Sequence, residues 1–292
     1  MRYLRGRGAV ALASLILLAS GCAPSEPSDV ALLAGTEVEI VVHTEWESQF
    51  EDAGVVGTFV LHRLESDVVD VGGSNRWSER FTPASTFKII NSLIALDTGV
   101  ISTVDEIVTW DGVERDVDVW NQDHSLRTAI EFSAVWVYQD LARRVGSERM
   151  QRLVSEVDYG NSDIGGPIDS FWLRGDLRIS AIEQVDVLAR LMVDGLPFDP
   201  ADQASVREIL VREAGPDWVW GHKTGTALAE EPVIGWLVGF TEFDGASWVF
   251  ALNVDLPVDP DLAAQINPEY RVSIAREILA SAGALPRHQR AR

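Results

Sequence analysis

The feature that most constrains the fold is a set of three consecutive runs near the C-terminal end, each with the length and patterning of a β-strand. They span residues 218–226, 233–241 and 247–256, and short polar turns join them. Connections this short suit neighbouring antiparallel strands. The three runs therefore predict an antiparallel meander, which must form much of one sheet.

Two further runs, at residues 55–61 and 68–71, predict a strand pair near the N-terminal end, with its turn at residues 65–67. Apolar periodicity between the two strand groups predicts helices, and another helix follows the meander. The order of strands, helices, strands and helix predicts an α+β fold, in which an antiparallel sheet is built from N- and C-terminal strands around a helical insert. The helices are expected at residues 83–97, 126–145, 180–193 and from 268 to about 282.

Charge and length exclude several classes of function. The chain of 292 residues has 45 acidic residues against 24 Lys and Arg, a formal charge of −21. Such an acidic surface argues against a nucleic-acid partner and against binding to anionic lipid headgroups. An apolar share of 46% is sufficient for a real core, and we assign residues 41–292 to a single domain.

Metal sites are also disfavoured. The single Cys excludes an internal disulfide and a Cys-based zinc site. The histidines show no H-x-H or H-E-x-x-H spacing, and His222 is interpreted as a packing or surface residue. The acidic run from 111 to 118 lacks the Gly and Glu positions of a calcium loop. The five histidines of the sequence are His43, His62, His124, His222 and His288. Because neither the histidines nor the acidic run has the spacing of a metal site, we expect no metal cofactor.

The N-terminal segment has the pattern of an export signal. Three arginines precede an apolar run over residues 9–19, and small residues follow as far as Cys22. This pattern predicts a signal peptide over residues 1–21 and a flexible tether over residues 22–40. The end of the segment resembles the lipobox of bacterial lipoproteins, which makes Cys22 a candidate for lipidation; ordinary secretion is the alternative. The rest is expected in the periplasm or cell envelope, with no transmembrane helix.

Only two of the 24 basic side chains are lysines, and both lie in short motifs. Lys88 ends an S-x-x-K motif that begins at Ser85, and Lys223 begins a K-T-G motif that continues through Thr224 and Gly225. These motifs are signatures of serine β-lactamases and penicillin-binding proteins. Taken singly, Ser85 could be a helix-start serine and Lys223 an edge-strand lysine, but the pair together favours a catalytic site.

The spacing of the first motif suits nucleophilic catalysis. Positions i and i+3 share a helix face, so Ser85 and Lys88 can touch. A serine hydroxyl needs a base, and a lysine can act as one only if burial lowers its pKa. The apolar neighbours of Lys88 supply that environment. We expect Thr82 to cap this helix and Pro83 to be its first residue, which places Ser85 near free N–H groups that favour an oxyanion.

Further motifs resemble those of the class D serine β-lactamases, the oxacillinases. Ser133-Ala134-Val135 is similar to the S-x-V motif of that class, and Tyr159-Gly160-Asn161 to its Y-G-N element. Phe171-Trp172-Leu173 resembles the stretch whose Trp contacts the active lysine. Arg271 fits the arginine that helps to bind the substrate carboxylate. The resemblance covers about residues 55–283, although each of these residues could instead serve only packing or loop structure.

The resemblance implies a mechanism without a metal or organic cofactor. Lys88 reacts with CO2 to give a carbamate (N6-carboxylysine), which serves as the general base for acylation and deacylation, and Trp172 donates a hydrogen bond to it. Ser133 relays a proton to the leaving nitrogen, and the N–H groups of Ser85 and Thr226 form the oxyanion hole. The residues assigned to substrate binding are Val135, Leu173, Lys223, Thr224, Gly225, Thr226 and Arg271.

The expected function is hydrolysis of penicillin-type β-lactams through a serine acyl-enzyme. The alternative is a β-lactam sensor or penicillin-binding protein, which acylates without turnover. Sensors of this type carry membrane helices and a zinc-protease region, neither of which is found in this sequence. The direct roles of Tyr159 and Asn161, the range of β-lactams and the oligomeric state stay open.

Overall fold

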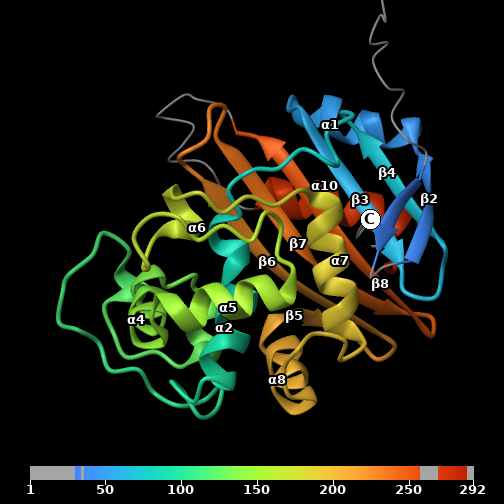
Figure 1. Cartoon of the computed structure of the whole chain (residues 1–292). Helices are drawn as coiled ribbons and strands as arrows, with labels where there is room; N and C mark the ends of the chain where they lie inside the picture. Colours follow the sequence, from blue (N-terminus) through green and yellow to red (C-terminus); the bar gives the residue numbers. More distant parts are fainter. Residues whose placement is uncertain (1–29, 34–35, 257–268, 288–292) are drawn as a thin grey trace, which may run out of the picture.

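The computed structural model describes residues 30–33, 36–256 and 269–287 (Figure 1). The predicted signal peptide, Cys22 and the first part of the predicted tether lie outside these residues. Eight strands of the described part form one sheet in the order β1-β2-β4-β3-β8-β7-β6-β5. The strands are β1 (Val30–Leu33), β2 (Thr36–Val42), β3 (Gly57–Arg63), β4 (Val68–Gly73), β5 (Val211–Ala214), β6 (Trp218–Ala227), β7 (Ile234–Phe243) and β8 (Ala246–Asp255).

The sheet joins the two ends of the chain as predicted. Strands β6, β7 and β8 form the antiparallel meander, and β3 pairs with β8 in antiparallel register, with Val60 opposite Ala251. One pair departs from the antiparallel expectation, because β2 lies parallel to β4. The prediction of a flexible tether over residues 22–40 is wrong for residues 30–33 and 36–40, which hydrogen-bond into the sheet. The alternating pattern of residues 36–42 was the signal for this strand.

Each face of the sheet packs against its own group of helices. Successive side chains of a strand point to opposite faces. On β8, Val249 and Ala251 accordingly join the larger apolar cluster with the helical insert, whereas Phe250 and Leu252 join a smaller cluster with the terminal helices. Figure 1 shows α7 (Ala181–Met192) in front of the strands and α10 (Glu269–Ser281) behind them.

The remaining helices divide between these two layers. Within the described residues, α1 (Glu47–Ala53) packs with α10 on one face, and the insert covers the other. None of the described helices is long and apolar enough to span a bilayer. The helices of the insert are α2 (Lys88–Asp97), α3 (Leu126–Glu131), α4 (Val135–Val145), α5 (Ser147–Val157), α6 (Phe171–Arg174) and α8 (Pro200–Leu210).

Two predicted helices are interrupted where the motifs lie. The helix expected over residues 83–97 begins with a 3-10 turn, η2 (Ala84–Phe87), and becomes α-helical only at Lys88. Thr82 does not cap it, because its hydroxyl and its N–H both bind the Glu230 carboxylate. The helix expected over residues 126–145 is broken between α3 and α4, and Ser133 adopts a left-handed φ of 54° there.

Candidate active site

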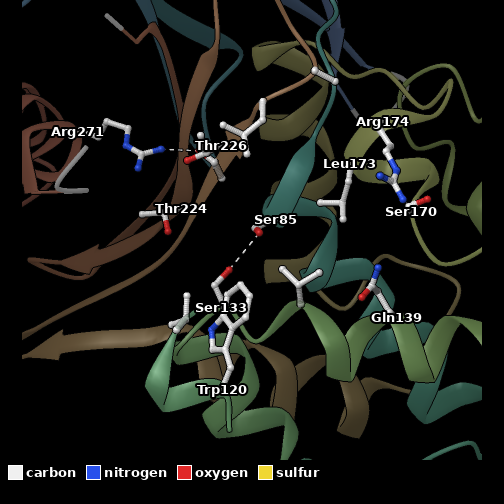
Figure 2. A pocket seen from close by; sticks show the side chains of 15 residues that line it. Ser85, Trp120, Ser133, Gln139, Ser170, Leu173, Arg174, Thr224, Thr226 and Arg271 are labelled. Carbon is white, nitrogen blue, oxygen red and sulfur yellow. Dashed lines mark hydrogen bonds between the residues drawn. The ribbon is translucent and has the colours of Figure 1, made fainter. Parts of the chain in front are cut away.

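A cavity of about 1000 Å³ lies between η2, the start of α4, α6 and strand β6 (Figure 2). Ser85 and Ser133 lie centrally in it, and Thr224 and Arg271 lie on the opposite side from Leu173. The lining residues are Ser85, Val117, Trp120, Ser133, Val135, Gln139, Ser170, Leu173, Arg174, Thr224, Gly225, Thr226, Leu228, Ala229 and Arg271.

The first motif forms the floor of this cavity. Ser85 lies in η2 and Lys88 begins α2, so one turn of backbone brings their side chains together. Lys88 Nζ donates to Ser85 Oγ at 2.8 Å. The whole Lys88 side chain is buried, whereas Ser85 is partly accessible from the cavity. A nucleophile facing the cavity with its base behind it is the arrangement that acyl transfer requires.

The environment of Lys88 favours its neutral form. Burial lowers the pKa of this amine well below its usual value, and the nearby positive charge of Lys223 lowers it further. No carboxylate of the described residues is within ion-pair distance of Lys88 Nζ; its hydrogen-bond partners are Ser85 Oγ, Ser133 Oγ and the Ser133 carbonyl. A neutral amine has a lone pair, and can therefore accept a proton from a hydroxyl.

Ser133 connects the two lysines. Its hydroxyl accepts from Lys88 Nζ at 2.8 Å and from Lys223 Nζ at 3.1 Å, and it lies 3.1 Å from Ser85 Oγ. The left-handed backbone of Ser133, and that of Ala84 with φ of 50°, are costly for residues with a Cβ. Both lie at or next to a reacting group, where surrounding structure holds an unfavourable conformation in place.

The second lysine lies behind the cavity wall. Lys223 is 3% exposed, and its Nζ also donates to the Thr224 carbonyl at 2.9 Å. Burial and the nearby charges of Arg212 and Arg271 lower its pKa to about 7. Of the K-T-G motif, only Thr224 and Gly225 line the cavity, so Lys223 reaches the site through Ser133.

Its neighbour His222 is not among the residues that line this cavity. Its ring lies 4.9 Å from the ring of Trp220, and burial lowers its pKa to about 3. A ring that stays neutral across the physiological range and packs against a tryptophan fits the predicted packing role.

Gly225 allows η2 to approach strand β6. A Cβ at this position would lie 3.1 Å from Thr86 Cγ2 and 3.2 Å from the Pro83 carbonyl oxygen. Thr86 is itself fixed, because its hydroxyl donates to the Pro83 carbonyl at 2.8 Å and accepts from Gln184 Nε2 at 2.7 Å. The turn that carries Ser85 is therefore anchored to both β6 and α7.

Arg271 projects from α10 to the same strand. Its side chain is 2% exposed, and its Nη1 donates to the carbonyls of Gly225 and Trp236. Its Nε has no hydrogen-bond partner among the described residues. A fixed guanidinium with a free donor beside Thr224 and Thr226 can bind a carboxylate.

Trp172 is fully buried and stacks on Phe87 with ring centroids 5.7 Å apart. Its Nε1 finds no partner within the described part of the chain. Leu173 and Val135, which the sequence assigns to substrate binding, line the cavity. A buried indole N–H without an acceptor is costly, so this donor is available for a group that the polypeptide itself does not supply.

Tyr159 and Asn161 support the site from outside the cavity. Tyr159 packs its ring against Phe87 at 5.4 Å in an edge-to-face arrangement. Asn161 Nδ2 donates to the Asp176 carbonyl at 2.8 Å, and its Oδ1 accepts from the Arg178 N–H at 2.9 Å. These contacts fix the loop after α6, and neither residue lines the cavity.

Several lining residues were missed in the sequence. Trp120 ends a 3-10 turn, η3 (Asp118–Trp120), and its Nε1 donates to the Phe132 carbonyl at 2.9 Å next to Ser133. Ser170 and Arg174 directly flank the Phe171–Leu173 stretch, so extending that stretch by one residue at each end would have found them. The other lining residues outside the predicted set are Val117, Gln139, Leu228 and Ala229.

Comparisons with known proteins agree with this site. Residues 65–280 match the sequence family described as the penicillin-binding protein transpeptidase domain. Beta-lactamase OXA-48 of Klebsiella pneumoniae is 40% identical over 241 residues, which cover 82% of this chain and 89% of that protein. Beta-lactamase OXA-10 of Pseudomonas aeruginosa is 38% identical over 259 residues, 87% of this chain and 95% of that protein.

Solved structures give the same result. The class D β-lactamase YbXI from Nostoc is 40% identical and superimposes with a TM-score of 0.77, covering 83% of this chain and all of that one. FUS-1 (OXA-85) of Fusobacterium nucleatum, another class D β-lactamase, has a TM-score of 0.77 at 39% identity, over 82% of this chain and 98% of that one. The motifs, the fold and these relatives together place the chain in the class D family of serine β-lactamases.

Proposed function

We propose that the protein hydrolyses penicillin-type β-lactams through an acyl-enzyme on Ser85, with Lys88 as the site of the general base. The observation that carries the proposal is the 2.8 Å contact between Ser85 Oγ and a fully buried Lys88 amine at the floor of the cavity. Because burial lowers the pKa of Lys88, a base at this position can take the hydroxyl proton as Ser85 attacks.

In the acylation step, Ser85 Oγ bonds to the lactam carbonyl carbon and its proton passes to Lys88. The ring C–N bond then breaks. The leaving nitrogen takes a proton from the Ser133 hydroxyl, and Ser133 takes in its place the proton held at Lys88. Ser133 suits this relay, because its Oγ lies 3.1 Å from Ser85 Oγ and accepts from both lysines. The backbone N–H groups of Ser85 and Thr226 would stabilise the oxyanion.

The ring carboxylate of the substrate would bind beside strand β6. Arg271 offers a fixed guanidinium with a free Nε, and the Thr224 side chain lines the same wall. Lys223 adds a positive charge behind Ser133 when it is protonated. Gly225 keeps this strand close to η2, so that the carboxylate site and Ser85 can act on one small molecule.

The residues around Lys88 fit a lysine carbamate. The pKa of Lys88 is lowered by burial, which leaves the neutral amine that reacts with CO2. Trp172 Nε1 is a buried donor without a partner in the described residues, and would hold the carbamate. Such a group would supply a carboxylate-like base, which would take the Ser85 proton in acylation and activate water in deacylation. We therefore include N6-carboxylysine at Lys88 in the proposal.

The location of the protein is part of the same proposal. We infer that residues 1–21 direct export to the periplasm or cell envelope, and that Cys22 is lipidated there. The expected anchor joins the catalytic domain through the residues that precede β1. Mass spectrometry of the mature protein tests this directly: a diacylglyceryl adduct on an N-terminal Cys22 is expected, and an unmodified mature N-terminus would contradict lipidation.

Turnover is tested with a chromogenic cephalosporin and benzylpenicillin. We expect many turnovers per molecule for the wild type and none above background for Ser85→Ala, because that change removes the nucleophile. The Ser205→Ala variant is a control for the loss of one hydroxyl, since Ser205 is half-buried on α8, does not line the cavity, and its hydroxyl donates to the Ala201 carbonyl of its own helix. Stoichiometric acylation without turnover would instead identify a β-lactam sensor.

A further inference from the structure

The charge of the cavity lining is opposite to that of the whole chain. The formal charge of the sequence is −21, yet none of the cavity-lining residues is acidic, while Arg174 and Arg271 are basic. Figure 2 shows the two arginines on opposite sides of the cavity, with Ser85 between them. Only Arg271 has a role in the proposed reaction, so the second guanidinium needs its own explanation.

Arg174 is held by its backbone and free at its side chain. It ends α6, where its N–H donates to the Ser170 carbonyl at 3.0 Å. The next residue, Gly175, has no room for a side chain, since a Cβ there would lie 2.3 Å from the Gly165 carbonyl oxygen. The guanidinium itself has no hydrogen bond or ion pair within the described residues. An anchored turn therefore presents an unpaired cation at the cavity.

The acidic residues nearest in sequence have other contacts. Asp169 accepts from Arg143 Nη1 at 2.8 Å. The Asp176 carboxylate packs against Gly165, so closely that a Cβ on that glycine would lie 2.2 Å from Asp176 Oδ2. Neither of them forms an ion pair with Arg174, so this charge is available to a ligand.

Ser170 supplies a second unused donor at the same wall. It is 1% exposed and precedes α6, but its hydroxyl does not cap that helix. Its Oγ has no partner in the part of the chain that the structure describes, and it lines the cavity. Figure 2 shows Ser170, Leu173 and Arg174 on the same side of the cavity. A buried hydroxyl without a partner is costly unless a ligand uses it.

We propose that Arg174 and Ser170 form a subsite for a second carboxylate, carried on the acylamino side chain of the β-lactam. This inference rests on the proposed hydrolase function. Arg271 holds the ring carboxylate on one side of Ser85, and the side-chain carboxylate binds the Arg174 guanidinium and the Ser170 hydroxyl on the other. Leu173 supplies an apolar contact for an aryl group on the same side chain. The enzyme should therefore favour dianionic penicillins over neutral-side-chain analogues of similar shape.

The test uses two penicillins that differ by one carboxylate: benzylpenicillin and its α-carboxy analogue, carbenicillin. The kcat/KM ratio of carbenicillin to benzylpenicillin is measured for wild type, Arg174→Gln, Arg174→Lys and Ser170→Ala. We expect Arg174→Gln to lower the ratio about fivefold or more, because it removes one charge-assisted hydrogen bond. Arg174→Lys should keep most of the ratio, and Ser170→Ala should lower it about twofold to threefold.

A matched control separates local charge from net charge. Arg152 is an exposed arginine of α5 that pairs with Glu156 on its own helix. Arg152→Gln changes the net charge equally, and should leave the ratio within twofold of wild type. The subsite would be disproved if Arg174→Gln changes both substrates in parallel, or if Arg174→Lys loses as much as Arg174→Gln. Benzylpenicillin turnover by wild type checks the hydrolase function separately, since its absence would overturn that function and not only the subsite.

Discussion

The two faces of the sheet differ in what they bury. The face covered by α1 and α10 buries aliphatic and aromatic side chains, among them Phe59 and Leu252. Among the described residues, both faces bury an unpartnered indole N–H, that of Trp220 on the first and that of Trp172 on the second, but the face covered by the insert also buries an amine, Lys88. Burying polar groups without full compensation costs stability. The difference indicates that the first face mainly stabilises the fold, whereas the second gives up some stability to hold a reactive amine.

The largest effect should follow from removing that amine. Lys88→Met keeps an unbranched side chain of similar length in an apolar site, and we expect kcat/KM to fall about 10³-fold or more. Stability should not fall, because a buried ionisable group is replaced by a thioether. Steady-state kinetics and thermal unfolding of the same preparation measure both. A variant that loses both activity and several degrees of Tm would show that Lys88 also supports the fold.

The opposite result is expected on the other face. Leu252→Ala in β8 leaves a cavity between the sheet and the terminal helices, and should lower the free energy of unfolding by about 2–5 kcal/mol. Below the unfolding transition, kcat/KM for benzylpenicillin should stay within twofold of wild type. Denaturant unfolding and kinetics at 20 °C measure the two quantities. A loss of activity as large as that of Lys88→Met would remove the distinction between the faces.

Trp172 tests whether the indole donor serves chemistry or only packing. Trp172→Phe keeps an aromatic ring against Phe87 but removes the N–H. We expect kcat without added bicarbonate to fall about tenfold, as for the loss of one hydrogen bond to a charged group, and to rise again with bicarbonate. The assay compares wild type and variant across a bicarbonate series after acid treatment. Equal loss at every bicarbonate concentration would indicate a packing role alone.

Lys223 gives the smallest expected effect, a pH dependence. Burial, with Arg212 and Arg271, lowers its pKa to about 7, so its positive charge is present below that pH and lost above it. Binding of the substrate carboxylate should therefore weaken as pH rises through 7, and KM for benzylpenicillin should increase about fivefold to tenfold by pH 9. Lys223→Arg keeps its charge throughout this range, and its KM profile should be flat. Parallel profiles for the two proteins would contradict this role.

Much of the arrangement follows from patterns in the sequence. Strand alternation and turn lengths predicted the β6-β7-β8 meander and its union with β3 and β4, because these signals are local. The S-x-x-K motif predicted the contact between Ser85 and Lys88, since i, i+3 spacing on a helix fixes which side chains meet, and the family resemblance pointed to Ser133, which contacts both lysines. The tether prediction was wrong for residues 30–33 and 36–40. The segment before β1 has the composition of a tether, and that assignment was carried on into residues that form β1 and β2.

The rest depends on tertiary contacts that no local pattern encodes. The 3-10 turn at η2 and the left-handed φ of Ser133 arise where the chain must bring one side chain against groups distant in sequence. Thr82 has the sequence of a helix cap, but Glu230 binds it instead. Ser170 and Arg174 belong to no motif, and become functional candidates only because the fold brings them to the wall of the cavity that Ser85 also lines.

The neutral state of Lys88 is tested most directly by ¹³C NMR with labelled bicarbonate. The chain has only two lysines, so Lys223→Arg leaves Lys88 as the sole lysine amine. We expect a carbamate resonance at pH 7.5 in wild type and in Lys223→Arg, and its absence in Lys88→Ala, which also controls for the chain's amino terminus. The absence of this resonance from wild type that turns over β-lactam under the same conditions, or its persistence in Lys88→Ala, would contradict a carbamate-bearing Lys88 as the base.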